Sequence, residues 1–196
     1  MKTIKKNNFC LINNNQNSLK IFSVIKKKIP ASVFCILEFE FFKDLINQKL
    51  INIFYLTKNN KIAAIITVIK HKDFINLKKK IIFYLLKNPH KIFFHFKTLF
   101  NTFKRDGAEN NFTISDDYLH LLHLIIKKEM FYKNSLKEKD NLINFFFNKI
   151  VKNFNAKYFY LCYEKSNIKA HKFYKRNKFK IYETTSNAIF VKKRFL

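Results

Sequence analysis

The residues best suited to proton chemistry are two histidines in an apolar stretch from Leu119 to Lys128. Histidine titrates near neutral pH, so His120 could take a proton from an attacking group. The continuous aliphatic run predicts a buried strand, on which residues three positions apart point to opposite faces. The two histidines are therefore predicted to be a poor metal site, and we expect no metal.

The three cysteines predict neither a metal site nor a disulfide framework. Cys10, Cys35 and Cys162 lie far apart, and no CxxC pair is present. Such residues are typical of small buried side chains in a reducing compartment. The N-terminus lacks a long apolar run, and no run reaches the ~20 residues of a membrane span. The sequence thus favours a cytoplasmic protein without a signal peptide or transmembrane segment.

The stretch from Ala156 to Phe179 predicts a strand, a loop, a helix and the start of another strand. Its first part, Tyr158–Tyr163, is aromatic and apolar, which favours a buried strand. Asn167 can cap the helix that follows. Ala170 and Tyr174 then lie four positions apart on one face of that helix.

Within this stretch, the run L-x-Y-x-x-x-N-x-x-A-x-x-F-Y-x-x-x-K-F resembles the C-terminal signature of the GNAT superfamily. These proteins are N-acyltransferases that use acetyl-CoA or a related thioester. The family usually has glycine where Lys178 stands. The resemblance implies an α/β (α+β) GNAT fold, with a central mixed, mostly antiparallel sheet flanked by helices. It also implies one domain, residues 1–196, and acetyl-CoA as co-substrate.

The resemblance places the pantetheine arm of CoA beside the strand at 119–128, where backbone groups are free. The pyrophosphate would bind the loop MFYKNSLKEK at 130–139, before a helix predicted over Asp140–Asn155. The family has glycines there, and this loop has none. Its lysines could compensate, or the loop is a solvated turn on a protein that binds CoA poorly. The cofactor-binding residues that the resemblance implies are Leu124, Ile125, Ile126, Asn134, Ser135, Leu136, Lys137, Lys139 and Asn167.

Acetyl transfer needs a neutral amine, a base that removes its proton and an acid that protonates the leaving thiolate. The resemblance implies that Tyr174 is the acid. It places His120 where many family members carry a glutamate, and thus makes His120 a candidate base. Asp116, Asp117 and a base that acts through water are alternatives.

The N-terminal part predicts a short strand, two helices and a β-hairpin. The strand lies near Phe9–Ile12, and Ser18 can cap a helix that runs to about Lys28. Ser32–Ile46 predicts a second, strongly apolar helix. Two β-type runs then flank Lys58–Lys61, a good turn because asparagine tolerates left-handed backbone. This order agrees with that of GNAT proteins.

A helical insert from about residue 72 to 111 precedes the central strand. Asn88 and Pro89 divide it into two predicted helices, Asp73–Lys87 and Pro89–Lys104. The segment is basic and aromatic, and a basic amphipathic helix can lie on a membrane surface. We expect it instead to pack on the core with its lysines in solvent. It weakly resembles a GNAT branch of sugar-related acetyltransferases, which hints at an amino sugar as acceptor.

The formal net charge is +26, with 39 lysines and arginines spread along the chain. A basic surface attracts anions, but the sequence has no zinc-finger spacing, RNP motif or heptads, so we expect no specific nucleic-acid partner. We predict an N-acetyltransferase that acts on a primary amine of a small molecule or a protein. The alternative is a GNAT-like domain without catalysis, a basic binding module for nucleic acid, a membrane surface or a protein partner.

Overall fold

The computed structural model describes residues 3–6, 9–13, 17–29, 32–96, 99, 118–131 and 135–195. Its described strands form an eight-stranded sheet in the order β1-β2-β3-β4-β5-β6-β8-β7. The strands are β1 (Thr3–Lys6), β2 (Phe9–Asn13), β3 (Asn52–Lys58), β4 (Lys61–Lys70), β5 (Tyr118–Ile126), β6 (Tyr158–Glu164), β7 (Lys180–Thr184) and β8 (Ala188–Arg194).

The described strands pair antiparallel except at the centre, where β5 and β6 run parallel. This mixed, mostly antiparallel sheet confirms the predicted fold class. The predicted hairpin is β3 and β4, and its turn places Asn59 and Asn60 at φ 49° and 58°. Asparagine tolerates this left-handed backbone better than most residues do. The predicted strand near Phe9–Ile12 is β2, whereas β1 was not predicted.

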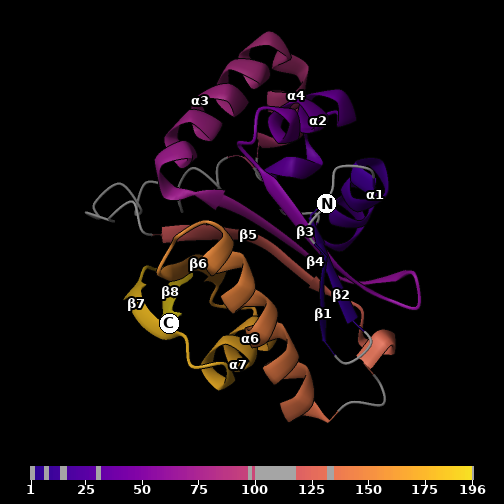
Figure 1. The fold of residues 1–196 in the computed structure, drawn as a ribbon. Helices are drawn as coiled ribbons and strands as arrows, with labels where there is room; N and C mark the ends of the chain where they lie inside the picture. Colours follow the sequence, from indigo (N-terminus) through magenta and orange to yellow (C-terminus); the bar gives the residue numbers. More distant parts are fainter. Residues whose placement is uncertain are drawn as a thin grey trace.

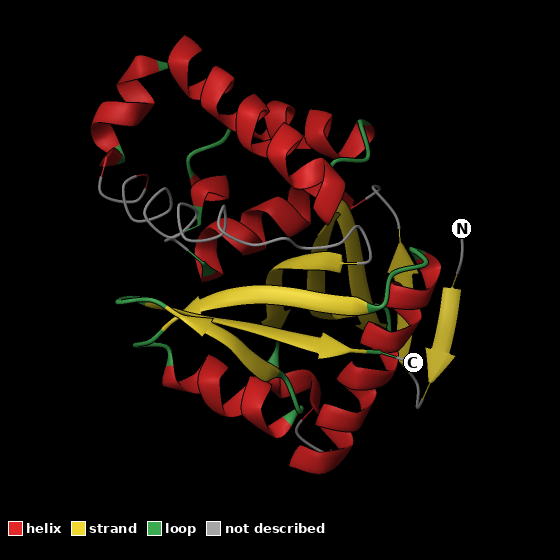
Figure 2. Ribbon diagram, turned by 90° about the vertical axis from the view of Figure 1, so that its left-hand side faces the viewer, coloured by secondary structure: helices red, strands yellow, loops and turns green. Residues whose placement is uncertain are grey.

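Helices cover both faces of the sheet, as Figures 1 and 2 show. The helices α1 to α4 lie on one face, and α6 and α7 lie on the other (Figure 1). The helices are α1 (Ser18–Lys28), α2 (Phe39–Asn47), α3 (His71–Lys87), α4 (Pro89–Phe94), α6 (Leu136–Asn153) and α7 (Ile168–Arg176), with 3₁₀ turns at Val33–Cys35 and Lys128–Phe131.

The sheet separates two apolar cores. On one face, α6 buries Phe146 and Phe147 against β6, in a cluster that also contains Tyr174. On the other face, α1, α2 and α3 pack on β3 and β4 around Phe42 and Ile81. Burial of these apolar surfaces is the main favourable contribution to folding.

The predicted helix Ser32–Ile46 is wrong as one element. The structure has a 3₁₀ turn at Val33–Cys35, and α2 begins only after Glu38, whose backbone is extended. The Glu38 carboxylate lies 2.8 Å from Lys91 Nζ, and its backbone N–H donates to the Tyr84 hydroxyl. These contacts with α3 and α4 hold Glu38 outside the helix, because tertiary contacts override local helix propensity.

Two further helix boundaries differ from the predictions. Ser18 is the first residue of α1 rather than its cap, because Asn17 occupies the N-cap position. The helix predicted from Asp140 begins at Leu136, so residues 136–139 are helical rather than loop. The division at Asn88 and Pro89 is confirmed. The predicted helix Pro89–Lys104 extends beyond α4 into residues that are mostly outside the described ranges.

Candidate active site

The strands β5 and β6 pair over a short distance and then diverge. They pair from Tyr118 and Tyr158 to His120 and Tyr160. Beyond these pairs β5 continues to Ile126 and β6 to Glu164, and the described residues of the two strands form no further ladder with each other. The divergence opens a wedge at the centre of the sheet. Backbone groups on the facing edges of the two strands are therefore outside the sheet ladder.

A cavity of about 350 Å³ occupies this wedge. Its walls come from β5 and β6, from α3 and the segment before α2 on one face of the sheet, and from α7 on the other face. Asn167, Ala170 and Tyr174 are the α7 side of the wall, and His120 and Leu124 belong to the β5 side. The cavity therefore passes from one face of the sheet to the other. Such a passage suits an extended, narrow ligand better than a compact one.

A β-bulge in β5 changes which residues share a face of this strand. Val68 pairs with Leu121 and Thr67 pairs with His123, which leaves Leu122 as an extra residue. His120 stacks on Phe74 of α3, and His123 bonds Thr67 and packs against Phe34, so both histidines contact the same core. The prediction that they face opposite sides is therefore wrong. An inserted residue reverses the two-residue alternation of a strand.

The described residues contain no group of three or more histidine, cysteine or acidic side chains that could hold a metal ion. The two histidines, although on one face, each have other partners. His120 Nε2 lies 2.8 Å from His71 Nδ1, and His123 lies 2.8 Å from both Ser32 Oγ and Thr67 Oγ1.

The candidate base His120 is buried at the end of the cavity that faces α3. Its burial, reinforced by His71 and Lys78, lowers the pKa of His120 to about 3. The imidazole is therefore neutral near pH 7. A base works best when its pKa is near the working pH. His120 can accept a proton under these conditions only if it passes its other ring proton to His71 in the same step.

Tyr174 lies on α7, where its ring stacks on Tyr163 with centroids 5.4 Å apart. The side chain is only 8% exposed, and it lines the cavity. Burial, together with Cys162 and Tyr163 nearby, raises the pKa of Tyr174 well above its ordinary value. The phenol therefore keeps its proton over the whole physiological pH range. A group in this state can act as a proton donor and not as a base.

A tyrosine–histidine contact beside Tyr174 was not predicted. The Tyr163 hydroxyl lies 3.0 Å from His171 Nδ1, and Tyr163 also lines the cavity. His171 is half-buried against Tyr163. No sequence signal could have found this contact, because it depends on how α7 packs across β6.

Asn167 caps α7 as predicted. Its side-chain oxygen accepts a hydrogen bond of 3.0 Å from the backbone N–H of Ala170. The residue also lies at the wall of the cavity. Of the three residues predicted to face the pantetheine arm, Leu124 lines the cavity. Ile125 and Ile126 pack into the cores on the two faces of the sheet.

The start of α6 is closed by its own side chains. Ser135 and Glu138 form a capping box, in which Ser135 N–H donates to the Glu138 carboxylate at 2.7 Å and Glu138 N–H donates to Ser135 Oγ at 3.2 Å. A carboxylate thus occupies the position that an anionic ligand would take. Lys137 is exposed here and Lys139 is half-buried. Of the other predicted residues of this loop, Leu136 is 51% exposed, and Asn134 lies outside the described residues, as do Asp116 and Asp117.

Polar contacts fix α7 against α6 beside this helix start. The Arg176 guanidinium binds the buried Asp140 carboxylate at 2.6 and 3.3 Å. Lys193 of β8 donates to Asn144 Oδ1 at 2.5 Å and to the Asn177 carbonyl at 2.8 Å. Burial, with Lys178 nearby, lowers the pKa of Lys193 to about 8. These contacts hold the helix that carries Asn167 and Tyr174.

Comparison with solved structures identifies the fold. No protein-family model and no curated protein matches the sequence. An N-acetyltransferase from Campylobacter jejuni, PseH, in complex with acetyl coenzyme A is 14% identical with a TM-score of 0.55 and covers 95% of this chain and 98% of its own. A spermidine N-acetyltransferase from Vibrio cholerae is 12% identical with a TM-score of 0.57, over 96% and 95% of the two chains.

A GNAT-family acetyltransferase from Listeria monocytogenes is also similar, with 11% identity and a TM-score of 0.55 over 99% of this chain and 100% of its own. At these identities the likeness concerns the fold. The chain therefore has the GNAT acetyltransferase fold over nearly its whole length, as the resemblance in the sequence predicted. None of the helices in the described part of the chain has the length and apolarity to cross a membrane.

Proposed function

We propose that the protein is an N-acetyltransferase that moves an acetyl group from acetyl-CoA to a primary amine. The observation that carries this proposal is the wedge between β5 and β6, with Tyr174 and Asn167 on its wall. Diverging strands offer free backbone groups to the amide-containing pantetheine arm. The similar PseH structure, which contains acetyl-CoA, supports the same co-substrate.

In the proposed reaction, the amine nitrogen attacks the thioester carbonyl carbon. A backbone N–H on the open edge of β5 stabilises the oxygen that becomes negative. The C–S bond then breaks, and Tyr174 gives its proton to the thiolate of CoA. Burial keeps Tyr174 protonated at every physiological pH, so its proton is present when the thiolate leaves.

The proton of the attacking amine would leave toward α3. We propose that His120 accepts it on Nδ1 while Nε2–H of His120 donates to His71 Nδ1, 2.8 Å away. His120 then carries no net charge at the end of the step, which suits its depressed pKa. His71 is half-buried and completes the route from the cavity. The proposed acceptor is a small amine or a protein amine, with an amino sugar as the hint from the sequence; one of the similar structures is a spermidine N-acetyltransferase.

The test combines ligand binding and turnover. Acetyl-CoA should raise the melting temperature, and a plain nucleotide at the same concentration should not, because only a ligand of the folded state stabilises it. Replacement of Tyr174 with phenylalanine should lower kcat by roughly a hundredfold and leave the acetyl-CoA affinity unchanged. Tyr182→Phe, on β7 away from the cavity, is the matched control. Equal kcat in the Tyr174 variant and the parent would remove this residue from the mechanism.

A second candidate function follows from the capping box at the start of α6. A carboxylate at the helix end and a loop without glycine both disfavour a bound pyrophosphate. The chain would then be a GNAT-like binding module without catalysis. Failure of millimolar acetyl-CoA to change the melting temperature would favour this function over the enzyme.

A further inference from the structure

The helix α3 is apolar on two sides. One stripe, formed by Leu77, Ile81 and Leu85, is buried in the core. A second stripe is formed by Ile75, Ile82 and Leu86, which are 63%, 41% and 66% exposed. These three residues are seven and four positions apart, so they align along one side of the helix. Packing of the insert on the core explains the first stripe and leaves the second without a structural purpose.

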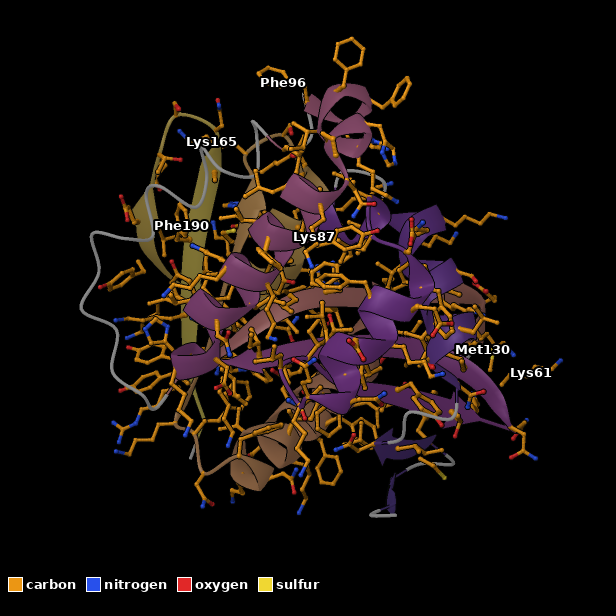
Figure 3. The ribbon with its side chains drawn as sticks, turned by 90° about the horizontal axis from the view of Figure 1, so that it is seen from above. Lys61, Lys87, Phe96, Met130, Lys165 and Phe190 are labelled. Carbon is orange, nitrogen blue, oxygen red and sulfur yellow. The ribbon has the colours of Figure 1, made fainter. Side chains whose placement is uncertain are left out.

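Aromatic residues extend the exposed stripe onto α4. Phe83 is 60% exposed beside it, and Phe93 and Phe94 of α4 are 82% and 77% exposed. The rings of Phe93 and Phe94 meet edge to face, 5.9 Å apart. Figure 3, which looks onto this side of the molecule, shows rings that project outward at the end marked by Phe96. We call the six residues Ile75, Ile82, Phe83, Leu86, Phe93 and Phe94 the outer face.

Lysines surround the outer face. Lys72, Lys79 and Lys87 are exposed on the same helix, and Lys87 Nζ lies 4.5 Å from the centre of the Phe83 ring (Figure 3). Residues 71–96 contain six lysines and a single acidic residue, Asp73. Aromatic and aliphatic side chains flanked by lysines are the composition that binds the boundary between lipid head groups and acyl chains.

The charges decide among the possible occupants of the outer face. A second copy of a chain with net charge +26 would bring two lysine-rich surfaces together, and like charges oppose that contact. A nucleic acid would use the lysines and could stack bases on the phenylalanines, but it has no use for the aliphatic side chains of Ile75, Ile82 and Leu86. An anionic bilayer uses both kinds of residue.

We propose that the outer face binds the surface of an anionic lipid bilayer, with its apolar side chains inserted among the head groups. This inference goes beyond the acetyltransferase proposal and does not depend on it. The inner side of α3 contributes Phe74, Leu77 and Ile81 to the cavity wall. A bound protein would therefore hold its cavity about one helix diameter, ~10 Å, from the lipid.

The experiment is co-flotation of the full chain with vesicles of phosphatidylcholine alone or mixed with phosphatidylglycerol. The parent should float with the mixed vesicles and much less with the neutral ones. A double variant, Phe93→Ser with Phe94→Ser, should bind at least roughly tenfold more weakly, because each ring loses its burial in the bilayer. Leu19→Ser with Ile181→Ser, two residues that are 58% exposed elsewhere, is the control and should bind like the parent.

A second pair of variants separates insertion from general charge. Lys79→Glu with Lys87→Glu should weaken vesicle binding more than Lys20→Glu with Lys180→Glu, which makes the same change of net charge on other surfaces. All four lysines are exposed. Equal loss in the two pairs, equal flotation of the phenylalanine variant and the parent, or no flotation of the parent would each overturn the proposal. So would concentration-dependent self-association that the phenylalanine variant abolishes.

Acetyl-CoA binding and turnover of these variants should remain at the parental level. A failed flotation with normal turnover removes only the membrane proposal, and normal flotation without turnover removes only the enzyme proposal.

Discussion

The space between β5 and β6 is created by the backbone paths of the two strands. At the start of α6, by contrast, the side chains of the cap decide whether an anion can reach the helix end. In the wedge, two strands separate after His120 and Tyr160, and a cavity follows between them. At the start of α6, a glutamate takes the place of an incoming anion, and no glycine opens the backbone. The comparison teaches that a cavity made by strand divergence needs no particular residue type, whereas a loop that brings its backbone close to a ligand needs glycine.

The largest effect should come from filling the wedge. Ala170 lies at the cavity wall, so Ala170→Trp would place an indole where the thioester arm is proposed to lie. We expect roughly a hundredfold weaker acetyl-CoA affinity by calorimetry, because the overlap must be relieved before binding. Lys172→Trp, exposed on the same helix, should bind normally. Unchanged affinity in the Ala170 variant would place the ligand outside the wedge.

The buried end of the wedge should also make stability depend on pH. The folded-state pKa of His120 is about 3 against 6.5 in the unfolded chain, so the unfolded chain binds a proton that the folded protein does not. The contribution of neutral His120 to the free energy of unfolding is therefore fully present well above pH 6.5, and it is lost as the pH falls toward 3. We expect a loss of about 2 kcal/mol between pH 6.5 and pH 5 in urea unfolding.

His120→Phe keeps an aromatic ring against Phe74 and removes the titration. The groups that face His120 are His71, Lys78 and Tyr160. The part of the pH dependence that disappears in this variant belongs to His120. An identical dependence in parent and variant would contradict the burial of a neutral imidazole at this position.

Removal of the negative charge of Glu138 at the start of α6 should raise the affinity for acetyl-CoA. Glu138→Gln can still accept the Ser135 N–H bond, but it no longer repels a phosphate. We expect acetyl-CoA to bind about threefold to fivefold more tightly at low salt, with a smaller gain at high salt. Glu40→Gln on α2 makes the same charge change elsewhere and should have no effect. Equal affinity in both variants would show that the pyrophosphate does not bind at this helix.

The smallest effect concerns Lys178, which stands where the resembled family has glycine. Its backbone has φ 61°, in the left-handed region that favours glycine. Lys178→Gly should raise stability by up to about 1 kcal/mol, or a few degrees of melting temperature. Lys175→Gly within α7 should instead lower stability by about 1 kcal/mol. A lower melting temperature of the Lys178→Gly variant would show that the lysine side chain stabilises the fold by more than its left-handed backbone destabilises it.

The elements that local patterns encode were predictable from the sequence. The hairpin around Asn59 and the unit from β6 to α7 carry their own turn and cap residues, and the structure contains both. The start of α6 was missed although Ser135 and Glu138 have the spacing of a capping box. The capping-box spacing was therefore present in the sequence, but residues 130–139 were interpreted as the pyrophosphate loop of the resembled family.

The parts that failed depend on contacts between distant segments. The helix break at Glu38 is held by Tyr84 and Lys91, which no local pattern reveals. The bulge at Leu122 lies in the pairing of β5 with β4, so the shared face of His120 and His123 could not be predicted from the alternation of residues along β5 alone. The same holds for the environment of Tyr174, because its burial comes from β6.

The position of α3 has a thermodynamic consequence. Its inner stripe lines the cavity, and its outer stripe faces away from the protein, so the helix is a common wall between two environments. If a ligand on the outer face moved this wall, the affinity of the cavity for an acceptor would change. Linkage then requires the acceptor to change the affinity of the outside ligand by the same factor. One helix would thus couple two binding equilibria without any contact between the ligands.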